Sequence, residues 1–257
     1  MGKLLIFNTA LILLIAVGLW LTKKYAVTAR KREWALLAAA AATILFHYST
    51  LLFKLFTGGG ALAYLAENPN LLLPIYPCNV VMWAALLFAL LKSKEGRLGR
   101  FLADYLFWFG IVATLVGMFA NVDFIKNPTL ADYENVKSIG AHATLLYNVL
   151  LLPLFGYTGV GVKRNMKSIL LCILMMAVIG GYCNLVFFAI GSAEVAYEVN
   201  SMFLLHSPFE GVALLTYPVI SLIALPIYYA VFTVCACFSA RLRRARDRFS
   251  GRVQDAS

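Results

Sequence analysis

One cysteine in this sequence of 257 residues has neighbours that suit nucleophilic chemistry. Pro74 and Pro77 precede Cys78, and proline is favoured in the first turn of a helix, where its missing N–H group is not needed. A helix that begins at either proline places Cys78 in its first or second turn. The helix dipole and the unpaired N–H groups there favour thiolate over thiol. The segment therefore predicts a cysteine nucleophile, with an ordinary buried cysteine as the alternative.

Two histidines could serve this nucleophile as a general base or an ion-pair partner. His142 lies near the start of one apolar run, and His47 lies near the middle of another. A histidine inside a membrane is also often a hydrogen-bonded structural residue, and that interpretation stays open. We predict that Cys78 and His142 form a catalytic pair and that His47 helps to bind the substrate.

Two asparagines could stabilise negative charge during such a reaction. Attack on a carbonyl group needs a hydrogen-bond donor for the oxygen that becomes negative. Asn79 follows the cysteine directly, and Asn184 lies a turn or two inside the end of an apolar run. Either side-chain amide could supply this donor, and we predict that both contact the substrate.

The elements that must position these residues are expected to be membrane helices. Hydrophobic residues make up 62% of the chain and charged residues only 13%, whereas a soluble domain is about half apolar and a quarter charged. A bilayer core about 30 Å thick requires about 20 apolar residues per helix. Seven runs meet this requirement: 3–22, 34–56, 71–91, 101–121, 139–161, 168–191 and 211–238. We predict an all-α bundle of seven transmembrane helices in one domain (1–240), followed by a basic tail (241–257).

Polar and small residues recur at helical spacing within two of these runs. Small residues permit close helix approach, and polar residues inside a membrane are costly unless they are paired or functional. The second run carries a polar stripe made of Thr43, His47, Thr50 and Lys54. The fourth run carries a stripe of small and polar residues made of Gly110, Thr114, Gly117 and Asn121.

The charges predict an orientation. Most of the 22 lysines and arginines lie on alternate connections, after the first, third, fifth and seventh runs. The positive-inside rule therefore places the N-terminus outside and the basic tail in the cytoplasm. Connections 57–70, 122–138 and 192–210 then face outside, and Cys78, His142 and Asn184 fall in the outer half of the bilayer. This distribution explains the net charge of +10 without a nucleic-acid partner.

No metal, cofactor or disulfide framework is expected. The three histidines are scattered, and no cluster of carboxylates with metal-ligand spacing lies in the predicted helices. All five cysteines fall inside predicted helices rather than in outside connections. The oligomeric state is left open.

Several segments, in order along the chain, resemble a known family. The string Leu73–Asn79, with its Pro–Cys pair, resembles the motif of the YwaF-like family of bacterial membrane proteins and of the related transmembrane protein 164 family. An aromatic–glycine segment at 105–110, His142 and Asn184 follow in the order that the family shows. Asn200, two residues before Met202, resembles the family's Asn-x-Met signature. The resemblance covers roughly residues 70–235.

This resemblance implies an acyltransferase-like enzyme that acts on phospholipid in a bacterial cytoplasmic membrane. The family's proposed Cys–His pair corresponds here to Cys78 and His142, and the signature adds Asn200 to the predicted substrate-binding residues. The sequence departs from the family pattern at Tyr76, where bacterial relatives often have histidine, and at Ser201, which replaces an aromatic residue.

Other functions remain compatible with the residues. The polar stripe of 34–56 could line the path of a small-molecule or ion transporter, and a membrane sensor or a non-catalytic assembly factor needs no nucleophile. A lipid acyltransferase or acyl hydrolase is the leading hypothesis because it alone uses Cys78 and His142 together.

Overall fold

The structure is a computed structural model that describes residues 2–119, 129–159 and 162–207, together with short pieces between 212 and 234. Within these residues the chain is helical and contains no strand, as predicted. The predicted seventh helix (211–238), with Cys235 and Cys237, and the basic tail fall largely outside the described residues.

The long apolar runs form helices close to their predicted positions. The main helices are α1 (Gly2–Tyr25), α2 (Ala29–Thr57), α4 (Pro77–Leu90), α5 (Arg97–Tyr105), α6 (Ile111–Phe119), α8 (Tyr133–Phe155) and α9 (Val162–Ile190). Shorter elements are α3 (Ala61–Glu67), η1 (Pro69–Leu71), the π-helical turn η2 (Leu106–Gly110), α10 (Ala193–Val199) and η3 (Ser201–Phe203).

Five helical segments in the described part of the chain are long and apolar enough to cross a bilayer. They are α1, α2, α8, the continuous helix Arg97–Phe119 formed by α5, η2 and α6, and Lys167–Ile190 of α9. Helix α4 is apolar but shorter. The prediction of an all-helical membrane protein is therefore confirmed, and the count of seven helices stays a prediction.

Helix α4 begins six residues later than its predicted range, 71–91. The chain turns through η1 and an irregular segment and becomes helical only at Pro77. Proline lacks an N–H group and restricts the residue before it to extended backbone, and Tyr76 is extended at φ −114° and ψ 151°. Leu71 and Ile75 of this irregular segment are buried, whereas Leu72 and Tyr76 are exposed.

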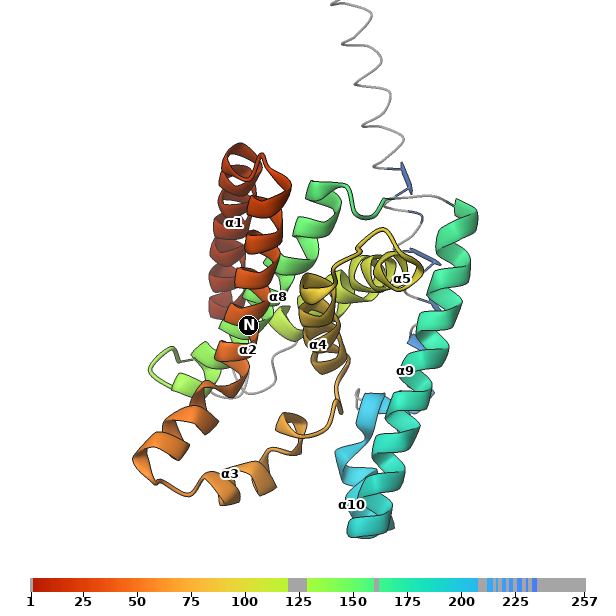
Figure 1. Cartoon of the computed structure of the whole chain (residues 1–257). Helices are drawn as coiled ribbons and strands as arrows, with labels where there is room; N and C mark the ends of the chain where they lie inside the picture. The colour runs from red at the N-terminus through yellow and green to blue at the C-terminus, as the bar shows by residue number, and fades with distance from the viewer. Residues whose placement is uncertain are drawn as a thin grey trace, which may run out of the picture.

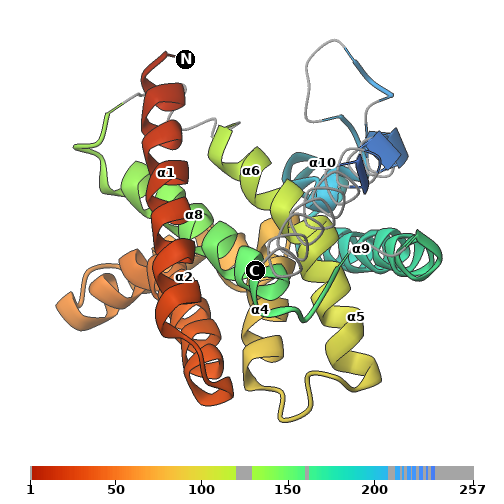
Figure 2. The ribbon, with the colours of Figure 1, turned by 90° about the horizontal axis from the view of Figure 1, so that it is seen from above.

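Helix α8 lies at the centre of the bundle and packs against α1, α2, α4 and α6. Figure 2 shows α1 and α2 on one side of it and α9 on the opposite side of the molecule. Helix α9 packs mainly on α5, α10 and η3. The main hydrophobic core lies where α4, η2 and α8 meet, around Phe88, Trp108 and Val149.

The alternate connections gather at opposite ends of the bundle. Figure 1 shows α3 and α10 at the lower end, here called the α3–α10 end, and the α1–α2 and α8–α9 connections at the upper end. Local signals fix these helix ends: Asp132 caps α8 by accepting from the Glu134 N–H, and Gly156 ends it at φ +80°. The separation of these connections (Figure 1) agrees with the sequence, in which basic residues lie on alternate connections.

Candidate functional site

Cys78 occupies the first turn of α4, as the two prolines predict. Pro77 is the first helical residue, and Cys78 is half-buried against the main core. Its sulfur lies within hydrogen-bonding reach of the backbone N–H groups of Cys78 and Asn79. The Asn79 N–H donates to the Tyr76 carbonyl at 3.0 Å. The Cys78 N–H has no earlier helical turn to bond to, so it is the backbone donor that the turn offers beside the sulfur.

Asn79 holds this turn together. Its side-chain Oδ1 accepts a hydrogen bond of 3.1 Å from the Tyr76 backbone N–H, which caps the start of α4. Only 4% of Asn79 is exposed. The other half of the amide, Nδ2, has no hydrogen-bond partner among the residues that the structure describes, so it is a free donor one residue from Cys78.

The segment from Asn200 to His206, here called the Asn200 loop, has an unusual backbone. Asn200, Met202 and Phe203 all have positive φ values of 46°, 56° and 53°. Residues other than glycine rarely adopt this region, and such strain persists only when the surroundings impose it. The Asn200 amide imposes part of it, because Oδ1 accepts from the Leu205 N–H at 3.0 Å and Nδ2 donates to the His206 carbonyl at 2.9 Å.

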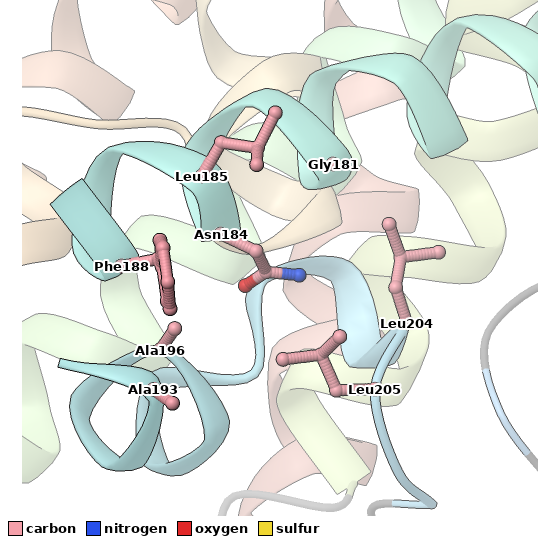
Figure 3. Close-up of a pocket in the computed structure, with 8 residues that line it drawn as sticks. All are labelled: Gly181, Asn184, Leu185, Phe188, Ala193, Ala196, Leu204 and Leu205. Carbon is pink, nitrogen blue, oxygen red and sulfur yellow. The ribbon is translucent and has the colours of Figure 1, made fainter.

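Asn184 of α9 fixes the same loop from the other side. Its Oδ1 accepts from the Ser201 N–H at 2.8 Å, and its Nδ2 donates to the Ser201 carbonyl at 3.3 Å. Figure 3 shows the side chain directed from α9 towards the segment that carries Leu204 and Leu205. It forms the polar part of an otherwise apolar groove of about 340 Å³ between α9, α10 and this segment.

The Asn200 loop is attached to the segment that leads into Cys78. The Met202 N–H donates to the Ile75 carbonyl at 2.8 Å, and the rings of Tyr76 and Phe203 have their centroids 6.0 Å apart. Met202 is fully buried against Gly180. Two of the segments that carry the family resemblance, far apart in sequence, therefore meet at the Pro–Cys turn.

His142 lies on α8 against α6. Its Nδ1 is 2.8 Å from the Ser138 carbonyl oxygen. A carbonyl can only accept, so in the neutral imidazole Nδ1 carries the proton and Nε2 keeps a free lone pair. The ring lies directly on Gly117, where a Cβ atom would overlap with Nε2. Gly117 is thus the small residue that makes room for the histidine.

His47 lies on α2, near the backbone of Asn70 and close enough to Lys137 and His142 to interact with them electrostatically. Its Nε2 is buried and has no hydrogen-bond partner among the described residues. The other residues of the predicted stripe share this face: Thr50 contacts α8 through Glu134, and Lys54 lies over the Tyr64 ring of α3.

The predicted site residues therefore fall into two groups at neighbouring positions. Cys78, Asn79, Asn184 and Asn200 belong to the Pro–Cys turn and its supporting loop, whereas His47 and His142 lie between α2, α6 and α8. Helices α4, α6 and α8 pack against one another. In the described structure no hydrogen bond joins Cys78 to His142, so the catalytic pair stays a prediction.

Sequence reasoning missed a buried carboxylate at the opposite end. Asp104 of α5 is 2% exposed and accepts hydrogen bonds from Thr158 at 2.9 Å and from Ser168 at 3.2 Å. It joins α5 to the α8–α9 connection and to α9. An acidic residue within a predicted membrane run was the available signal, because such residues are rare unless paired.

Taken together, these features define a helical membrane protein with a Pro–Cys turn held by a strained loop. The family model of the TMEM164 family matches residues 3–242, and the chain belongs to this family. The match confirms the resemblance to the transmembrane protein 164 family. No curated protein and no solved structure is similar to the chain in the other two comparisons.

Proposed function

We propose that this protein is a lipid acyltransferase or acyl hydrolase that uses Cys78 as its nucleophile and His142 as its general base. The observation that carries the proposal is the Pro–Cys turn, which places Cys78 beside the first backbone N–H groups of α4 and one residue from the Asn79 amide. The substrate would be a phospholipid or another acyl lipid, because the residues belong to the apolar helices of a membrane protein.

The reaction would proceed through a thioester on Cys78. Nε2 of His142 takes the thiol proton while sulfur bonds to the ester carbonyl carbon, and the carbonyl electrons move onto its oxygen. The carbon–oxygen bond then breaks, the lysolipid leaves as an alcohol with the proton from His142, and the acyl group remains on sulfur. A second lipid hydroxyl or a water molecule attacks the thioester and restores the thiol.

The donors at the turn suit the oxygen that becomes negative. The backbone N–H of Cys78 lies beside its sulfur, and Asn79 adds an Nδ2–H₂ group one residue away. Donors placed before the reaction stabilise an oxyanion without rearrangement. Asn184 and Asn200 use their amides on the loop backbone, so we assign them the role of holding the turn.

We also propose that the α3–α10 end faces the outside of a bacterial cytoplasmic membrane and the basic connections face the cytoplasm. The charge asymmetry of the connections supports this orientation. A reporter inserted near residue 130 is expected to be active only outside, and one inserted after residue 30 or 97 only in the cytoplasm. Cytoplasmic activity at residue 130 would contradict the orientation.

The test of the proposed function is a search for the acyl-enzyme. Purified protein is incubated with phospholipid, quenched in acid and analysed by intact and peptide mass spectrometry. We expect an acyl group on Cys78 that hydroxylamine removes, because hydroxylamine cleaves thioesters. His142→Ala should slow acylation by roughly a hundredfold or more, the usual contribution of a general base.

Cys172→Ser is the matched control, since Cys172 is a buried cysteine of α9 away from the turn. It should acquire the acyl group at the normal rate, and Cys78→Ser should acquire no hydroxylamine-sensitive group. An unmodified Cys78 in a protein that keeps its fold would contradict the enzyme. A transporter or a membrane sensor would then explain the polar residues better.

A further inference from the structure

Five side chains at the α3–α10 end form a polar network across three helices. The α2–α3–α8 cluster consists of Thr50 and Lys54 of α2, Tyr64 of α3, and Glu134 and Lys137 of α8. The Glu134 carboxylate pairs with Lys137 and accepts from Thr50 at 2.7 Å and from Tyr64 at 3.2 Å. The Lys137 ammonium also donates to the Tyr64 hydroxyl oxygen at 2.6 Å.

This cluster holds one positive charge in excess. Glu134 compensates Lys137, and its oxygens are already occupied by three donors. Lys54 has no carboxylate partner among the residues that the structure describes, and its ammonium lies 5.4 Å from the centre of the Tyr64 ring. The Lys137 ammonium lies 5.3 Å from the same ring. Two cations therefore flank one tyrosine, and only one of them is neutralised.

A second unpaired group lies on the same face of α2. His47 precedes Lys54 by seven residues, which is two helical turns, so both side chains project from one stripe. Its Nε2 is buried without a partner in the described residues, and Lys137 and His142 are its charged or titratable neighbours. A buried polar atom without a partner is costly in a membrane protein, so the His47 Nε2 is available to a further hydrogen-bond partner.

We propose that the α2–α3–α8 cluster binds the phosphate group of a phospholipid, with Lys54 as its main charged contact and His47 beneath it. A phosphodiester carries one negative charge, which matches the one uncompensated cation, and its oxygens accept hydrogen bonds from ammonium groups. An anion at this position would favour the protonated form of His47, whose Nε2–H could donate to it. The proposal rests on the proposed function for its lipid substrate.

This position would orient a lipid relative to the catalytic residues. His142 is one of the titratable neighbours of His47, so a phosphate above His47 would lie on the side of the bundle that carries the general base. The acyl chains of a lipid anchored there extend from the α3–α10 end towards the bilayer centre. The cluster would thus place an ester group, a few bonds from the phosphate, near His142.

The test measures binding in Cys78→Ser protein, which cannot form the thioester. Native mass spectrometry and a fluorescent-lipid competition assay compare phosphatidylglycerol, diacylglycerol and inorganic phosphate as probes. We expect phosphatidylglycerol to bind and diacylglycerol to bind at least about tenfold more weakly. Lys54→Gln should lower the affinity for phosphatidylglycerol by about tenfold, a typical loss for a charged hydrogen bond. Lys54→Arg should keep binding within about threefold.

Lys3→Gln is the control for a general effect of charge. Lys3 is an exposed lysine near the start of α1. The α1–α2 connection lies at the upper end in Figure 1, so the start of α1 and the end of α2 both lie away from that end. Removal of Lys3 should leave binding unchanged. Equal loss in Lys3→Gln and Lys54→Gln, or no loss in either, would overturn the site. If inorganic phosphate at millimolar concentration binds to the site and phosphatidylglycerol does not, free phosphate is the ligand and the lipid site is wrong.

The binding test and the acyl-enzyme test can fail separately. If Cys78 is never acylated, the catalytic proposal is wrong, but Lys54→Gln can still weaken the binding of phosphatidylglycerol to the Cys78→Ser protein. If Lys54→Gln binds lipid normally while wild-type Cys78 becomes acylated, the enzyme stands and the phosphate site is wrong. The melting temperature of each variant, measured without lipid, shows that the fold is intact.

Discussion

Asn184→Ala is expected to lower the free energy of unfolding by about 2–4 kcal/mol and the melting temperature by several degrees. Ser201 is fully buried, and both its N–H and its carbonyl bond to the Asn184 amide. Alanine leaves the Ser201 N–H unpaired, at a cost of about 1–3 kcal/mol. The Ser201 carbonyl keeps only the longer bond of 3.4 Å from the Leu204 N–H, and the lost bond from the asparagine amide adds about 1 kcal/mol. Thermal unfolding in detergent measures the effect.

Two variants show which part of the loss comes from the hydrogen bonds. Asn184→Asp keeps an acceptor for the Ser201 N–H but loses the donor for its carbonyl, so it should also destabilise the fold. Val178→Ala on the same helix is the control, because Val178 is 63% exposed and contributes no polar contact. An unchanged melting temperature in Asn184→Ala would show that the loop is held by other contacts.

The position of Cys78 could be predicted from the sequence because proline acts locally. Pro77 can begin a helix but cannot continue one from its N-terminal side without losing a hydrogen bond, so the first turn of α4 follows from residue type alone. The run 71–91 is apolar throughout, and hydropathy gives no sign that its first six residues form η1 and an irregular segment.

The role of the asparagines could not be predicted in the same way. Asn184 and Ser201 are 17 residues apart, and their hydrogen bonds depend on how α9 and the Asn200 loop pack. The three positive φ values in this loop occur at Asn200, Met202 and Phe203, and only asparagine among them favours that conformation. Tertiary contacts, such as Met202 N–H to the Ile75 carbonyl, impose the rest.

The polar stripe of α2 was predicted, but its partners were not. Spacing alone places His47, Thr50 and Lys54 on one face. Helix α8 begins at Tyr133, six residues before the predicted run at 139. Glu134 and Lys137 therefore belong to this helix, whereas the prediction placed them in an outside connection. The early start arises from the Asp132 cap, a signal that hydropathy does not register.

Gly117→Ala is expected to slow acylation of Cys78 by roughly a hundredfold. The His142 ring lies on Gly117, and an added Cβ would overlap with Nε2, so the imidazole must move or rotate. A displacement of about 1 Å of a reacting group can reduce a rate about a hundredfold. The measurement is the rate at which hydroxylamine-sensitive acyl groups appear on Cys78.

The double variant with His142→Ala separates a positioning role from general packing. If Gly117 acts only by making room for His142, then Gly117→Ala should have no further effect on acylation in a His142→Ala background. Gly181→Ala is the matched control, because a Cβ at this helical glycine would meet nothing within 4 Å, and its rate should stay within about twofold. An equal loss in both backgrounds would mean that Gly117 supports the packing of α6 against α8 rather than the position of the base.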